Sequence, residues 1–123
     1  MSTILIVEDN EKNMKLVRDV LQVKGYRTLE AGSAEDGIRL AIEYKPDLVL
    51  MDIQLPGMNG IDALGVLRKD ATTASIPVIA VTASVMQQDR KLITEAGFDG
   101  YIGKPINLKE FLATVQQMLR GQQ

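Results

Sequence analysis

Polar side chains that could take part in group transfer recur directly after apolar segments of the chain. Glu8 and Asp9 follow the first apolar segment, Asp52 follows the most apolar one, and Thr82 and Lys104 follow two later ones. A carboxylate can accept a phosphoryl group as an acyl phosphate when neighbouring carboxylates hold a divalent cation. A hydroxyl and an ammonium can receive the remaining phosphoryl oxygens. The set therefore predicts phosphoryl transfer to a carboxylate, with Mg²⁺ as the cation because it needs only one or two carboxylates plus phosphate.

Each of these residues, taken alone, also has an ordinary structural explanation. Asp9 or Asn10 could cap the following helix, Thr82 could do the same for a later helix, and Lys104 could be a solvated lysine. Asp52 resists such an explanation because no basic residue lies near it in the sequence. Carboxylates gathered at one place repel, so we expect raised pKa values and a cost in stability unless a proton or a cation intervenes.

The composition excludes several classes of chemistry. The chain of 123 residues has no cysteine and no histidine, so disulfides, thiolate and imidazole metal sites, cysteine nucleophiles and phosphohistidine carriers are ruled out. The formal net charge of -2 gives no attraction to nucleic acid or to anionic lipid, so neither is expected as a partner. The first apolar run, Ile4–Val7, is too short for a signal peptide or a spanning helix, and a cytoplasmic location is expected.

Short apolar segments alternate with longer segments of helical periodicity, which indicates strands buried on both faces between crossover helices. The expected strands are Thr3–Val7, Tyr26–Ala31, Leu48–Met51, Ile76–Thr82 and Gly100–Gly103. The expected helices are Asn10–Lys24, Ser33–Tyr44, one through Ile61, Leu64 and Leu67 to Lys69, one from Ser84 to Ala96, and one from Asn107 to Leu119. This alternation predicts one α/β domain over residues 1–123, with a frayed tail at 121–123.

The connections between these elements determine where the polar residues meet. Right-handed crossovers and helices on both faces predict a doubly wound parallel sheet, and five strands suit the flavodoxin-like order 2-1-3-4-5. The chain leaves the first and third strands in opposite directions, so a crevice opens beyond their carboxyl ends. Glu8, Asp9 and Asp52 are therefore expected at one mouth, with Thr82 and Lys104 at the same rim.

Four segments of the chain resemble the response-regulator receiver domains, the CheY-like family. They are Leu5–Asn10, Leu50–Gly60, Pro77–Ala83 and Tyr101–Pro105. The resemblance extends over essentially the whole length of the chain, and the spacing of these segments is highly specific. It implies the same doubly wound fold and a phosphorylatable site at the carboxyl ends of the strands.

The resemblance also implies a role for each site residue. Asp52 corresponds to the phosphoacceptor, Asp9 to a Mg²⁺ ligand, and Glu8 to a residue that holds the metal directly or through water. The main-chain carbonyl of Gln54 would supply a further ligand oxygen. The side chains of Gln54 and Ser84 are expected beside the path by which water reaches the phosphoryl group.

Further residues correspond to the conformational switch of the family. Thr82 and Lys104 match the hydroxyl and the lysine that pair with the phosphoryl oxygens, and Tyr101 matches the switch aromatic. The peptide bond between Lys104 and Pro105 is expected to be cis, as is usual in the family. The resemblance thus implies that phosphorylation changes the surface of the last two helices and the last strand.

The implied function is that of a single-domain response regulator in a two-component phosphorelay. A histidine kinase or a histidine phosphotransfer protein would supply the phosphoryl group, and a downstream protein effector would receive the signal. Such a protein catalyses its own phosphorylation and dephosphorylation but is not otherwise an enzyme, and we expect a monomer or weak dimer. The segments Glu8–Glu11 and Met51–Pro56 are most similar to those of a single-domain regulator of cell division.

Other functions of the same topology fit the sequence less well. A flavin-binding protein needs a phosphate-cradling loop after the first strand, where this chain has Glu8, Asp9 and Glu11. A haloacid-dehalogenase-like phosphatase needs a second aspartate two residues after the first, and that position is Gln54. A P-loop motif is absent from the sequence. The alternative that stays open is a phosphorylation-independent adaptor with a receiver fold.

Overall fold

A computed structural model of the chain describes residues 2–83 and 87–120, with residues 87–90 described by their backbone alone. Strands and helices alternate strictly along it. The strands are β1 (Thr3–Val7), β2 (Arg27–Ala31), β3 (Leu48–Asp52), β4 (Val78–Thr82) and β5 (Gly100–Gly103). The helices are α1 (Glu11–Val23), α2 (Ala34–Tyr44), α3 (Gly60–Lys69), α4 (Gln87–Ala96) and α5 (Leu108–Arg120). The predicted number and order of elements are confirmed.

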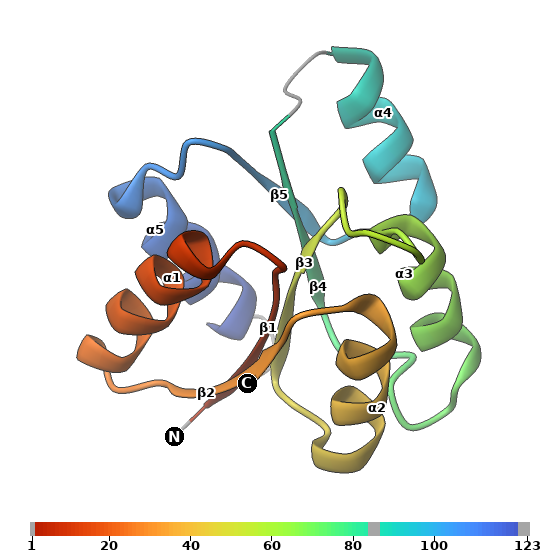
Figure 1. The fold of residues 1–123 in the computed structure, drawn as a ribbon, viewed down its shortest axis with the longest axis horizontal. Helices are drawn as coiled ribbons and strands as arrows, with labels where there is room; N and C mark the ends of the chain where they lie inside the picture. The colour runs from red at the N-terminus through yellow and green to blue at the C-terminus, as the bar shows by residue number, and fades with distance from the viewer. Residues whose placement is uncertain (1, 84–86, 121–123) are drawn as a thin grey trace.

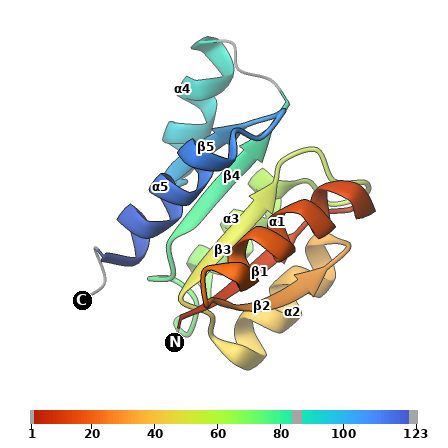
Figure 2. The same ribbon diagram turned by 90° about the vertical axis from the view of Figure 1, so that its left-hand side faces the viewer.

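The five strands form one parallel sheet in the order β2-β1-β3-β4-β5, which can be followed in Figure 2. Helices α1 and α5 lie on one face of the sheet, and α2, α3 and α4 lie on the other (Figure 1). Because both faces are covered, all residues of β3 and β4 are buried. The predicted doubly wound, flavodoxin-like topology is confirmed.

Two strands start later than the sequence predicted. β2 begins at Arg27 because the N–H of Tyr26 still donates a hydrogen bond to the last turn of α1, at 3.1 Å. β4 begins at Val78 instead of Ile76, since Pro77 has no N–H for the sheet ladder. Neither shift changes which residues lie at the carboxyl ends of the strands.

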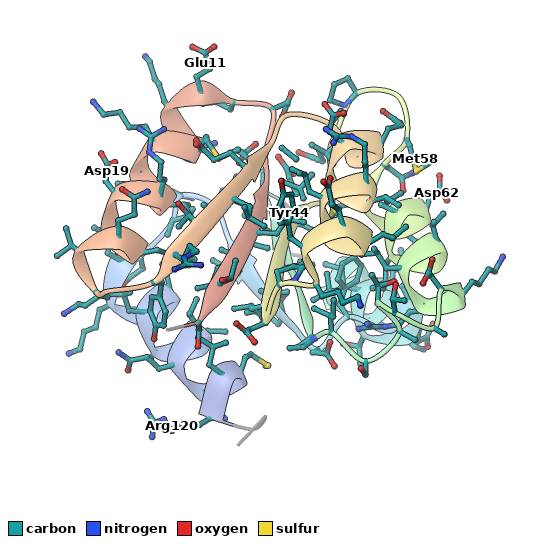
Figure 3. All side chains as sticks on the ribbon, turned by 90° about the horizontal axis from the view of Figure 1, so that it is seen from below. Glu11, Asp19, Tyr44, Met58, Asp62 and Arg120 are labelled. Atoms are coloured by element: carbon teal, nitrogen blue, oxygen red, sulfur yellow. The ribbon has the colours of Figure 1, made fainter. Side chains whose placement is uncertain are left out.

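Two apolar clusters fill the space between the sheet and its helices, one on each face, and side chains occupy both layers in Figure 3. The predicted apolar stripes of the helices are buried in these clusters or pack against them partly buried, except for two exposed residues in first turns. Ile61 at the start of α3 is 37% exposed, and Leu108 at the start of α5 is 40% exposed. No helix within the described ranges is long and apolar enough to cross a bilayer.

Side chains cap the amino ends of four helices. Asn10, Ser33, Asn59 and Asn107 each accept a hydrogen bond from a backbone N–H in the first turn of α1, α2, α3 and α5, respectively. These bonds pair N–H groups that have no partner within the helix. The predicted cap at Ser84 and the predicted frayed tail at 121–123 lie outside the described residues.

The carboxyl end of α2 has a left-handed residue that is not glycine. Lys45 has φ 48°, a conformation that costs a non-glycine residue about 1–2 kcal/mol. We expect Lys45→Gly to raise the free energy of unfolding by about 0.5–1 kcal/mol, because glycine removes this cost but loses about 0.5–1 kcal/mol of backbone entropy. Denaturant unfolding measures the change. Lys24, which caps α1 at φ -84°, is the matched control, and Lys24→Gly should be destabilising. A stability loss of equal size in both variants would contradict the explanation.

Candidate functional site

Asp52 lies at the end of the most central buried strand. It is the last residue of β3, not the residue after it as the sequence suggested, and only 3% of its surface is exposed. Its Oδ1 accepts a hydrogen bond from the N–H of Gln54 at 2.9 Å. Its Oδ2 lies 2.9 Å from the Nζ of Lys104. The carboxylate is therefore oriented by one backbone donor and one charged donor.

Lys104 connects two of the acidic residues. Its Nζ lies 2.9 Å from Oε1 of Glu8 and 2.9 Å from Oδ2 of Asp52. Its backbone N–H donates to the carbonyl of Thr82 at 2.8 Å, which keeps the chain beside β4 as it leaves β5. The peptide bond between Lys104 and Pro105 is cis, as predicted.

Glu8 and Asp9 follow β1 but differ in environment. Glu8 is 6% exposed, and besides its ion pair it accepts a hydrogen bond at Oε2 from the N–H of Asn10 at 3.3 Å. Asp9 is exposed. Of the two candidates for the cap of α1, Asn10 makes the capping bonds, to the N–H groups of Lys12 and Asn13. The carboxylate of Asp9 is thus not required as a helix cap.

The three carboxylates meet as the topology predicted. Glu8, Asp9 and Asp52 each place an oxygen within 4.8 Å of the others. Ligand oxygens around Mg²⁺ lie about 2.0–2.1 Å from the ion, so opposite ligands are about 4 Å apart and small side-chain shifts would bring these three into its coordination shell. Three carboxylates and the ammonium of Lys104 leave two negative charges when all are ionised, which a divalent cation neutralises. The residues therefore fit a hard divalent cation.

The site is reachable from the surface on the side of α1 and β2. An open cavity of about 500 Å³ borders Glu8 and Asp9, and Gly32 after β2 forms part of its wall. Residues of α1, among them Glu11 and Arg18, line much of the rest. A hydrated cation can thus approach Glu8 and Asp9 without unfolding of the sheet.

The two buried carboxyl groups of the site have pKa values that are shifted in opposite directions. Burial, and then the neighbouring Asp52, raise the pKa of Glu8 to about 7, against the lowering effect of Lys104. Burial also tends to raise the pKa of Asp52, but hydrogen bonds with Glu8, Lys104 and the N–H of Gln54 outweigh it and the pKa is lowered. Burial disfavours the charged form of Lys104, yet its hydrogen bonds to both acids raise its pKa.

The expected rise in pKa therefore occurs at Glu8, whereas at Asp52 the ammonium of Lys104 intervenes, as the expectation allowed, and the pKa falls. Lys104 and the N–H of Gln54 contact Asp52 directly, and hydrogen bonding to the charged form favours it. Without a bound cation, a shared proton belongs mainly to Glu8 while Asp52 keeps its charge. Asp52 is thus the member of the pair whose charged form is favoured.

The other predicted site residues lie on the two neighbouring strands. Thr82 ends β4 and is 3% exposed, and its strand neighbour Val81 pairs in register with Asp52. Tyr101 of β5 is half-buried and packs against the apolar cluster on the face of α2, α3 and α4. Ser84, predicted beside the water path, lies outside the described residues.

One residue of the site was not assigned a role from the sequence. A Cβ at Gly60 would lie 2.6 Å from the carbonyl oxygen of Asp52 and 2.9 Å from the Cα of Ile53. The sequence shows only that a glycine stands at the start of a segment with helical periodicity. It does not predict which atoms of the folded protein lie close to that glycine. The close approach of α3 to the end of β3 is a tertiary feature.

Comparison with known proteins agrees with the geometry. Residues 4–116 match the response regulator receiver domain family. The polar-differentiation response regulator DivK of Brucella ovis is 44% identical over 117 residues, which cover 95% of this chain and 95% of that protein. The DivK of Brucella anthropi has the same identity and coverage.

Solved structures give the same result. The receiver domain of a sensor histidine kinase from Pseudomonas aeruginosa PAO1, crystallised with a magnesium ion in its active-site cleft, is 31% identical and superposes with a TM-score of 0.89 over 96% of this chain and 97% of that one. A CheY-like receiver domain protein from Methanospirillum hungatei is 29% identical with a TM-score of 0.90, over 99% and 96% of the two chains. By sequence and by structure, the chain belongs to the response regulator receiver domain family.

Proposed function

We propose that the chain is a phosphoacceptor in a two-component phosphorelay and that Asp52 takes the phosphoryl group in a Mg²⁺-dependent reaction. The observation that carries this proposal is a buried carboxylate of lowered pKa that lies 2.9 Å from a lysine and beside two further carboxylates. The magnesium ion in the Pseudomonas receiver domain supports the choice of metal. Similarity to DivK over 95% of both chains supports action as a single receiver domain in cell division or polarity.

The proposed reaction assigns a task to each residue. The donor is a phosphohistidine of a histidine kinase or a histidine phosphotransfer protein. An oxygen of Asp52 bonds to phosphorus as the P–N bond breaks, and the bonding pair stays with the imidazole nitrogen of the donor. Glu8, Asp9, Asp52 and the carbonyl of Gln54 would hold Mg²⁺, which supplies positive charge beside the transferring oxygens when it is bound. Lys104 already contacts the nucleophile and would pair with a phosphoryl oxygen after transfer.

Phosphorylation would change the conformation of the protein at the β5 edge of the sheet. In our proposal the hydroxyl of Thr82 also binds a phosphoryl oxygen, and Tyr101 turns inward into the space that this movement opens. A ligand shifts such an equilibrium only through contacts that differ between the two states, and Thr82 and Lys104 supply them. The face of α4, β5 and α5, including the turn at Pro105, would then meet a downstream protein effector.

Phosphorylation by a small donor tests the proposal directly. Incubation with acetyl phosphate and Mg²⁺ should add one phosphoryl group, seen as a mass increase of the intact protein, and a chelator of Mg²⁺ should prevent it. Transfer from a phosphorylated histidine phosphotransfer protein should give the same product. If neither donor labels the chain, a phosphorylation-independent adaptor becomes the better interpretation.

Gln54 is expected to control the lifetime of the phosphorylated form. Its side chain is exposed beside Asp52, while its backbone N–H binds Oδ1. Gln54→Arg should lengthen the half-life of the aspartyl phosphate and Gln54→Ala should shorten it, because a larger side chain obstructs water and a smaller one admits it. We expect changes of up to about tenfold, since no strong base is lost. Decay of the phosphorylated protein, followed by mass spectrometry, measures the effect.

The stoichiometry of phosphorylation should stay that of the parent, since neither change removes the main-chain carbonyl. Gln117→Ala, at an exposed glutamine of α5, is the control and should leave the half-life unchanged. Identical half-lives in the parent and both Gln54 variants would place control of water access at another residue.

A further inference from the structure

The first residue of α3 packs directly on the backbone that carries Asp52. The loop and the first turn of this helix are marked by Met58 and Asp62 in Figure 3. A Cβ at Gly60 would be 2.6 Å from the Asp52 carbonyl oxygen and 2.9 Å from the Ile53 Cα, both closer than real Cβ contacts. These are main-chain atoms of the sheet and its exit loop, so no side-chain rotation relieves the contact.

The segment after Asp52 is held from two sides. The N–H of Ile53 donates to the carbonyl of Val81 in β4 at 3.1 Å, and the carbonyl of Ile53 accepts from the N–H of Gly60 at 3.1 Å. The next residue, Gln54, donates its N–H to Oδ1 of Asp52 at 2.9 Å. The orientation of the Asp52 carboxylate therefore depends on a peptide whose position is determined by β4 on one side and by α3 on the other.

We propose that Gly60 is a positioning residue for phosphoryl transfer at Asp52. Because it has no side chain, α3 can approach closely enough to hold residues 52–54 in place. This contact keeps the Gln54 N–H on Oδ1 of Asp52 and sets the position of the Gln54 carbonyl, the proposed main-chain ligand of Mg²⁺. The inference rests on the proposed function, since the reaction that Gly60 supports is the phosphorylation of Asp52.

Two glycines of the same helix provide a matched test. Gly60→Ala pushes against the backbone of β3, whereas a Cβ at Gly65 has no atom within 4 Å. At saturating acetyl phosphate and Mg²⁺, Gly60→Ala should lower the rate constant of phosphorylation by about tenfold to a hundredfold, the effect of moving a reacting group by up to an ångström. Its affinity for Mg²⁺, measured by titration, should fall as well. Gly65→Ala should match the parent in both measurements.

A destabilised variant separates positioning from loss of stability. Leu67 of α3 is 2% exposed, so Leu67→Ala lowers the melting temperature without touching residues 52–54. We expect its phosphorylation rate at saturation, measured below the melting transition, to match the parent. If Leu67→Ala slows the reaction as much as Gly60→Ala does, or if Gly60→Ala keeps the rate and Mg²⁺ affinity of the parent, the positioning role is wrong.

Amide exchange in the parent extends the test to the case in which Gly60→Ala does not fold. The proposal requires the N–H of Gly60 to exchange as slowly as the N–H groups of β3, because it opens only when the helix leaves the sheet. Exchange at the rate of an exposed loop amide would overturn the proposal. Failure of the parent itself to accept a phosphoryl group would instead refute the proposed function, and the Mg²⁺ affinities and the exchange rates would still decide whether Gly60 holds residues 52–54.

Discussion

Asp52→Asn is expected to accept no phosphoryl group from acetyl phosphate. The amide has nearly the same shape, and its single oxygen can accept one of the two hydrogen bonds that Gln54 and Lys104 donate to separate oxygens of the carboxylate. It lacks the charged oxygen that attacks phosphorus, so the nucleophile is lost while the size and shape of the side chain are kept. Intact-protein mass spectrometry after incubation with acetyl phosphate and Mg²⁺ measures the result, and the expected loss is complete.

Asp62→Asn is the matched control for this variant. Asp62 lies exposed in the first turn of α3, and the change removes the same charge and adds the same amide. We expect it to be phosphorylated as fully as the parent. Stoichiometric, Mg²⁺-dependent labelling of Asp52→Asn would mean that another carboxylate is the acceptor, and peptide mapping would identify it.

Asp9→Ala is expected to remove most of the stabilisation that Mg²⁺ gives to the fold. Lys104 forms ion pairs with Glu8 and Asp52, each at 2.9 Å, and in the described contacts it forms none with Asp9. Asp9 is therefore the one carboxylate of the three without an ion pair in the described contacts, and its charge is fully available to a cation. A ligand at a hundred times its dissociation constant stabilises the native state by about 2.7 kcal/mol. A tenfold weaker site loses about 1.4 kcal/mol of this, and we expect at least that loss.

Thermal unfolding with and without Mg²⁺ measures the effect. Glu11→Ala is the control, because Glu11 lies close by in the first turn of α1 but is not one of the three clustered carboxylates. It should keep most of the shift in melting temperature. Without Mg²⁺, Asp9→Ala should be at least as stable as the parent, since one repelling charge is gone. A melting temperature that rises with Mg²⁺ in Asp9→Ala as much as in the parent would contradict the assignment.

The sequence by itself determined the order of the elements and the edge of the sheet at which the site lies. Apolar runs buried on both faces and helical periodicity are local properties, and each is repeated over many residues. The right-handed crossover rule then leaves few topologies, and parallel strands place their carboxyl ends together. For this reason the sequence alone predicts that Asp52, at the end of the central strand, lies beside Glu8 and Asp9.

Only the tertiary structure decided how these residues interact. The ion pair of Lys104 with Asp52 joins residues 52 positions apart, and its geometry depends on rotamers and on the exact paths of β3 and β5. Both carboxyl groups are buried, but burial and the neighbouring Asp52 raise the pKa of Glu8, whereas hydrogen bonds with Glu8, Lys104 and the N–H of Gln54 lower the pKa of Asp52. The residue types alone predict that these charges attract one another. They do not predict which carboxylate oxygen accepts a hydrogen bond from which donor.

The close approach of Gly60 to the end of β3 belongs to the same class of features. A glycine can start a helix for several reasons that the sequence does not distinguish. The structure shows that any Cβ at Gly60 would lie 2.6 Å from the carbonyl oxygen of Asp52, so a side chain does not fit there. Periodicity and topology are averages over whole elements and tolerate shifts of an ångström. Hydrogen bonds, ion pairs and steric contacts change over tenths of an ångström, so they emerge only when the complete chain has packed.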